Sequence, residues 1–92
     1  MKISRRRQYI NALKDIMAYI SKDSKNRAIS FRDALENQIE DLVNFPYKYR
    51  QSFHSNNPNV RDMIHKGYTI IYHINTEDDM IEILEIFKYK NR

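Results

Sequence analysis

Cysteine is absent from this 92-residue sequence, glycine occurs once and proline twice. Without cysteine, disulfides, thiolate zinc sites and thiol nucleophiles are excluded. A single glycine also excludes the glycine-rich loops that bind nucleotide phosphates. No apolar run approaches the about 18 residues that cross a membrane, and no signal-peptide apolar stretch follows the basic N-terminus. We therefore expect a cytoplasmic protein with no membrane contact.

The residues that are present predict one small domain covering 1–92. Hydrophobic residues make up 41% of the chain, which is enough for one core. A domain of this size buries only about 60–65% of the surface that its unfolded chain exposes, so its stability margin is small. A partner that binds only the folded form would stabilise it further.

Positive charge is concentrated at the two ends of the chain. Residues 1–7 hold four basic residues and no acidic one, and residues 88–92 hold three more. The segment 8–87 holds nine basic residues and all twelve acidic ones. Cationic ends of this kind suit an acidic protein, RNA or DNA as a partner, although solvated termini are a common alternative.

Apolar residues recur every three or four positions in two stretches, 7–21 and 25–44, which predicts two helices. The polar turn between them is short and offers Asp23 or Ser24 as a helix cap, so the helices are expected to pack as an antiparallel hairpin. Phe45–Pro46 ends the second helix, because a residue before proline avoids the helical region.

From residue 60 the apolar period changes to two, which predicts strands over 60–65 and 68–74 with Lys66–Gly67 as the turn between them. Residues 80–87 are apolar on both faces apart from two glutamates, as in a central strand. Residues 1–5 form a further short edge strand, and 46–58 reads as a loop.

These elements predict the α+β class. The expected architecture is an N-terminal strand and an antiparallel helix hairpin packed on a largely antiparallel four-stranded sheet, in the order β-α-α-β-β-β.

Four segments together resemble the RelE/ParE toxin superfamily, and its ParE branch more than its RelE branch. The segments are L-K-D-I-M-A-Y-I at 13–20, L-V-N-F-P at 42–46, the hairpin V-R-D-M-I-H-K-G-Y-T-I-I-Y at 60–72, and I-L-E-I at 83–86 followed by Lys88 and Arg92. Each is ordinary alone, and their order and spacing carry the resemblance. It departs at Thr69, where the family commonly has arginine, and at Lys88, where ParE-like chains often have histidine.

The resemblance implies the toxin component of a type II toxin–antitoxin system, of the kind linked to plasmid stabilisation and growth inhibition. ParE-like members are associated with binding DNA gyrase and have no active site of their own. It further implies a cognate antitoxin, with which the chain would form a hetero-oligomer, and no cofactor. The candidate target-binding residues are Arg50, Arg61, Lys88, Lys90 and Arg92, and the candidate antitoxin-binding residues are Leu13, Met17, Phe31 and Leu35.

Two alternatives stay open. A RelE-like, ribosome-dependent mRNA endonuclease would need a base, an acid and cations to stabilise the charged transition state. Its candidate catalytic residues are Arg61, His65, His73, Lys88 and Tyr89. A degenerate, non-toxic family member that only binds its partner is the other alternative, suggested by the departures at Thr69 and Lys88. The three histidines have no carboxylate at ligand spacing, so no metal site is expected.

Overall fold

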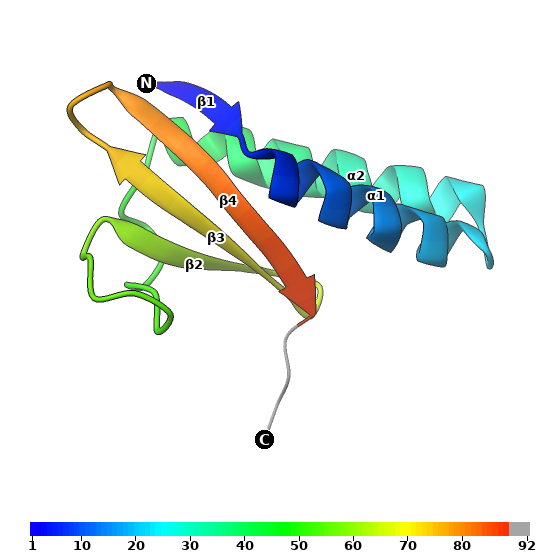
Figure 1. Ribbon diagram of the computed structural model, residues 1–92. Helices are drawn as coiled ribbons and strands as arrows, with labels where there is room; N and C mark the ends of the chain where they lie inside the picture. The colour runs from blue at the N-terminus through cyan, green and yellow to red at the C-terminus, as the bar shows by residue number, and fades with distance from the viewer. Residues whose placement is uncertain (89–92) are drawn as a thin grey trace.

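The computed structural model describes residues 1–88 and contains two helices and four strands (Figure 1). The elements are β1 (Lys2–Arg5), α1 (Arg7–Ser21), α2 (Lys25–Glu40), a 3-10 turn (Asp41–Val43), β2 (Val60–His65), β3 (Tyr68–Asn75) and β4 (Met80–Lys88). This order confirms the expected β-α-α-β-β-β architecture. No helix within these residues is long and apolar enough to cross a membrane.

The four strands form one sheet in the order β1-β4-β3-β2, so the N-terminal and C-terminal strands are neighbours. β1 pairs with β4 in parallel, whereas β2, β3 and β4 pair antiparallel. β4 is therefore an interior strand of the sheet, as is β3, in line with its two apolar faces. The predicted turn is also confirmed, since Lys66 and Gly67 have φ angles of 48° and 84°, which a two-residue hairpin turn requires.

α2 begins and ends where local chemistry allows. Ser24 is the N-cap of α2, and its hydroxyl oxygen accepts the N–H of Arg27 over 3.1 Å, which satisfies a backbone donor at the helix start. α2 ends at Glu40, and the chain then tightens into the 3-10 turn before Pro46. The regular helix is thus a little shorter than the predicted range 25–44.

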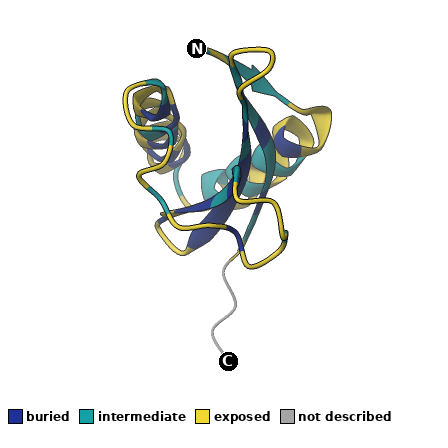
Figure 2. Cartoon of the chain, turned by 90° about the vertical axis from the view of Figure 1, so that its left-hand side faces the viewer, coloured by how far each residue is buried: buried dark blue, intermediate teal, exposed yellow. Residues whose placement is uncertain are grey.

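The core lies between the helix hairpin and one face of the sheet, here called the inner face (Figures 1 and 2). Buried side chains from both helices meet every second residue of the strands. The core residues are Tyr9, Phe31, Leu35, Ile39, Leu42, Met63, Tyr68, Ile70, Tyr72, Ile74, Ile81, Ile83 and Ile86. A bulge interrupts this alternation in β4, where Ile81 and Ile83 are followed in the core by Ile86, because the register on β3 shifts between Ile71 and Tyr72.

One carboxylate connects three elements at the rim of this core. Glu36 of α2 accepts hydrogen bonds from the guanidinium of Arg5 in β1 and from the hydroxyl of Tyr9 in α1. Burial is the main reason that the pKa of Tyr9 is raised well above its usual value, and the Glu36 charge raises it further. Because a buried hydroxyl without a partner is costly, this contact fixes how the hairpin sits on the sheet edge.

A loop covers part of the outer face of the sheet, which is the face turned away from the helices. Its segment 50–54 runs along β2, where the Ser52 N–H donates to the Val60 carbonyl over 2.7 Å and the Asp62 N–H donates to the Arg50 carbonyl over 3.1 Å. The ring of His54 then packs edge-on against Phe87, with centroids 5.4 Å apart. β3 is consequently buried on both faces in the middle of the sheet.

His65 at the end of β2 supplies a stability switch in the weakly acidic range. Its side chain is buried against the ring of Phe31, and its Nδ1 lies 2.8 Å from Gln38 Oε1. Burial, and then the nearby Lys66 charge, lower the pKa of His65 below 6.5. The unfolded chain therefore takes up a proton at a higher pH than the folded chain does.

We expect the free energy of unfolding to fall as the pH drops below about 6.5, by at most about 1.4 kcal/mol per pH unit from this one group. The variant His65→Gln keeps a hydrogen-bond partner for Gln38 but does not titrate, so it should flatten this slope. Urea titrations between pH 7.5 and 5.5 measure the effect. An equal slope for His65→Gln and wild type, or a flattened slope in the control His54→Gln at an exposed loop residue, would contradict this account.

Candidate functional site

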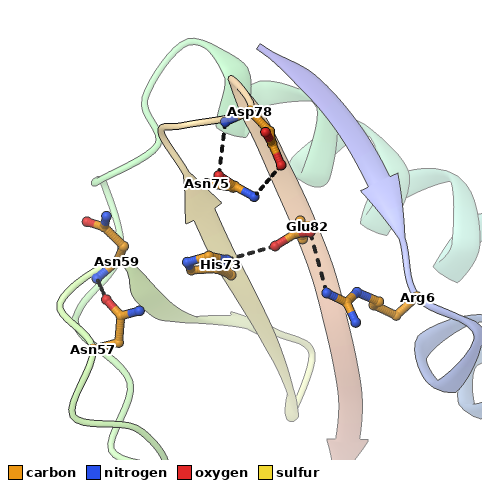
Figure 3. Close-up of polar contacts among 7 residues, drawn as sticks. All are labelled: Arg6, Asn57, Asn59, His73, Asn75, Asp78 and Glu82. Atoms are coloured by element: carbon orange, nitrogen blue, oxygen red, sulfur yellow. Dashed lines mark hydrogen bonds and ion pairs between the residues drawn. The ribbon is translucent and has the colours of Figure 1, made fainter.

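A histidine, a glutamate and an arginine form a polar cluster on the outer face of the sheet (Figure 3). His73 Nδ1 in β3 lies 2.7 Å from Glu82 Oε1 in β4, and Arg6 Nη2 donates to Glu82 Oε2 over 3.4 Å. The hydrogen bond with His73 is the main reason that the pKa of Glu82 is lowered, and the Arg6 charge lowers it further. A carboxylate that holds Nδ1 leaves Nε2 as the ring nitrogen able to exchange a proton with a bound molecule.

Two amide-rich turns flank this cluster (Figure 3). The side chain of Asn75 accepts the N–H of Asp78 over 3.0 Å and donates to its carboxylate over 3.2 Å. The side chain of Asn57 accepts the N–H of Asn59 over 2.9 Å. Their amides therefore serve to hold the turns. Across residues 1–88, no three His, Asp or Glu side chains gather as a bound metal ion would require.

Arg61 has a structural set of partners. Its Nε donates to the Pro58 carbonyl over 2.9 Å, and its Nη1 donates to the Tyr49 carbonyl over 3.0 Å. The guanidinium also lies 4.9 Å from the centre of the Tyr47 ring. Arg61 thus holds the two ends of the loop together, which leaves few of its donors for a phosphate.

The candidate catalytic residues do not gather at one point of the sheet. Arg61 pairs with Tyr72 and His65 pairs with Tyr68, so they occupy opposite ends of the β2–β3 hairpin. Lys88 lies at the His65 end, beside Tyr68, and its ammonium is 5.4 Å from the centre of that ring. His73 is on the outer face, and Tyr89 lies outside the described residues.

An open groove of about 430 Å³ lies where α1 meets the end of β4. Its lining combines the exposed side of α1 with the last residues of the strand. The lining residues are Ala12, Asp15, Ile16, Tyr19, Tyr68, Ile86, Phe87 and Lys88. This mixture of apolar, acidic and basic groups suits an amphipathic protein segment better than a small metabolite.

The candidate antitoxin-binding residues differ in how far they can be reached. Leu13 and Met17 on α1 are half-buried. Phe31 and Leu35 on α2 are buried in the core, 5% and 0% exposed, because they fill the space above Tyr68 and its neighbours. Among the candidate target-binding residues, Arg50 and Lys88 are exposed. Lys90 and Arg92 lie outside the described residues.

A second surface contains Arg50, one of the target-binding candidates named from the sequence. Residues 44–53, here called the loop surface, carry Phe45, Tyr47 and Phe53 with 60%, 49% and 80% of their area exposed. An open hollow of about 620 Å³ lies at its start, lined by residues 44–48. The sequence shows aromatic and basic residues alternating in F-P-Y-K-Y-R at 45–50. This pattern alone does not say which of the side chains are exposed.

One protein family matches this chain over almost its whole length. The family described as the ParE toxin of the type II toxin–antitoxin system, parDE, matches residues 3–91. No curated protein matches the chain.

Several solved structures share the fold. A chain from the chromosomal ParDE toxin–antitoxin system of P. aeruginosa has a TM-score of 0.79 at 16% identity, over 98% of this chain and 97% of that one. The isolated E. coli RelE toxin has a TM-score of 0.71 at 10% identity, over 99% and 86%. A chain of the intact E. coli RelBE toxin–antitoxin complex has a TM-score of 0.64 at 9% identity, over 99% and 98%.

The contacts of Arg61 predict a specific effect of its removal. Arg61→Ala loses two hydrogen bonds from a charged donor, so the free energy of unfolding should fall by about 2 kcal/mol. Chymotrypsin should also cut faster after Tyr47 and Tyr49. The matched control is Arg32→Ala, whose guanidinium pairs only with the adjacent exposed Asp33 and should change stability by less than about 0.5 kcal/mol. Equal stability and cleavage rates in both variants would refute the structural role.

Proposed function

This chain belongs to the ParE toxin family of type II toxin–antitoxin systems, and we propose that it inhibits growth in the cytoplasm by binding DNA gyrase. The fold that it shares with ParDE and RelE proteins is consistent with both branches of the superfamily. What has to be argued from the chain itself is the choice between contact with a protein target and cleavage of RNA.

The observation that carries the proposal is the dispersal of the groups that RNA cleavage needs. A transition state with developing charge requires cations and an acid–base pair within reach of one phosphate. Here Arg61 is bound to backbone carbonyls, His65 is buried against Phe31, and Lys88 lies over Tyr68. Thr69, at the position where the family commonly has arginine, is 2% exposed. Inhibition by binding makes no such demand on geometry.

An antitoxin is the natural partner of such a toxin. The solved relatives include a ParDE system and an intact RelBE complex. In this chain we propose that the antitoxin occupies the groove between α1 and the end of β4, next to the half-buried Leu13 and Met17. The basic N-terminal segment would attract an acidic antitoxin segment and give an association rate that falls with salt.

A second candidate function is mRNA cleavage, and one observation favours it. The His73–Glu82 pair resembles the carboxylate-oriented histidines that act as general bases. In that case the 2′-hydroxyl of RNA would be the group that His73 deprotonates. The pair stands on a different face from Lys88 and Arg61, which is why we rank this function second.

We expect the purified chain to inhibit plasmid supercoiling by gyrase and to leave ribosome-bound mRNA intact. Lys88→Glu should weaken inhibition several-fold by reversing a charge at the proposed contact surface, whereas His73→Ala should leave it unchanged. Lys14→Glu, on the exposed side of α1, is the matched charge-reversal control. Supercoiling gels and primer extension on ribosome-bound mRNA measure the two activities. Intact supercoiling together with mRNA cuts that disappear in His73→Ala would replace this proposal with the nuclease.

A further inference from the structure

We infer that the loop surface, residues 44–53, is a binding site for single-stranded nucleic acid. The inference concerns a surface separate from the His73 cluster and from the groove on α1, and it does not depend on gyrase being the target. Its basis is the pairing of exposed aromatic rings with cations over one short segment.

The first observation is composition. From residue 44 to residue 61 the chain has three basic residues, four aromatic residues and no acidic residue. Two carboxylates adjoin this stretch, since Asp62 is buried 3.6 Å from Arg50 and Asp41 lies 4.0 Å from Lys48. Three basic side chains against these two acidic ones leave a small positive balance, and the ligand this surface suits is an anion with flat, apolar parts.

The second observation is that each cation lies over a ring. Arg50 is 4.2 Å from the centre of Phe53, Lys48 is 5.5 Å from that of Tyr49, and Arg61 is 4.9 Å from that of Tyr47. Stacking platforms beside backbone-neutralising cations are the features that bind single strands without sequence preference. Bases in a duplex are already stacked on each other, so this surface should prefer single strands.

The third observation is exposure and placement. Phe53 is 80% exposed and Phe45 is 60% exposed, so neither ring is needed to fill the core. Arg61 of β2 lies over the Tyr47 ring. Its neighbour in the strand, Asp62, pairs with Arg50, which lies over the Phe53 ring. Alternate residues of a strand point to opposite faces, so these two rings flank the edge of β2 and give a strand a path across it.

Protein docking is the competing use, since aromatic residues and arginine are also common in protein interfaces. Nucleic acid is favoured because the loop surface also carries the exposed amide residues Asn44 and Gln51, and the adjoining Asn56 is exposed as well. Amide, cationic and aromatic side chains together are the three groups that contact base edges, phosphates and base faces.

The test is fluorescence anisotropy of the full-length chain with fluorescein-labelled oligo(dT) and oligo(rU), and with a DNA duplex for comparison. Both single strands should bind more tightly than the duplex. The slope of log affinity against log salt should be about −1.4 or steeper, because Lys48 and Arg50 would neutralise two phosphates. Tighter binding of oligo(rU) would identify RNA as the ligand, and tighter binding of oligo(dT) would identify DNA.

Variants separate stacking from charge. Phe53→Ala and Phe53→Leu should each weaken binding at least about fivefold, because leucine is apolar but offers no ring for stacking. The matched control is Tyr19→Ala, which removes an aromatic residue that is 68% exposed on α1 with the Lys22 ammonium 6.0 Å from its ring centre. That variant should bind as wild type does. Thermal unfolding of each variant confirms that the fold is retained.

Three results would overturn the inference. The first is no binding of either single strand at low salt. The second is equal binding of Phe53→Leu and wild type, together with displacement by poly-glutamate, which would assign the surface to an acidic protein. The third is equal loss of binding in Tyr19→Ala and Phe53→Ala, which would mean that the aromatic residues act non-specifically.

Discussion

The middle of β3 is buried from both sides, and most of the structure follows from that constraint. Residues 68–72 are all buried, so the sheet needs a cover on each face. The helix hairpin covers the inner face, and the loop segment 50–54 covers part of the outer face. Residues 1–88 form no third layer, and polar contacts order the loop. Arg61 and Asp62 supply these contacts. Arg61, a candidate catalytic and target-binding residue, therefore has a structural role.

The cover on each face of the sheet decides which side chains remain exposed for binding. Loop residues that face the sheet, such as Ser52, are buried, whereas Phe45 and Phe53 are turned outward and exposed. The uncovered part of the outer face retains the His73–Glu82–Arg6 cluster. The groove between α1 and the end of β4 is open because no loop reaches it. The groove, the polar cluster and the loop surface thus remain open on a very small protein.

Much of the fold could be predicted from the sequence because periodicity reports burial directly. The period of three to four gave both helices, the alternation after residue 60 gave the hairpin, and the two-faced apolarity of 80–87 placed β4 in the centre. The predicted Lys66–Gly67 turn is present, and it pairs His65 with Tyr68. Tyr68 and Tyr72 both lie in the core.

The candidate site was harder to predict, because it depends on register and on the loop. A bulge beside Ile71 changes which residues of β4 share a face with those of β3, so the contact of His73 with Glu82 was not visible from alternation. The cover provided by 50–54 has no periodicity, and the partners of Arg61 are backbone carbonyls that sequence does not display. The roles of the target-binding and antitoxin-binding residues stay predictions.

We propose that this toxin acts on DNA metabolism by binding and not by cutting RNA. Inducing the chain alone in bacteria, with pulse-labelling of DNA and of protein in the same cultures, tests this proposal. DNA synthesis should fall first while protein synthesis continues. An earlier fall in protein synthesis would contradict it and would direct attention to His73 and Glu82 as a catalytic pair.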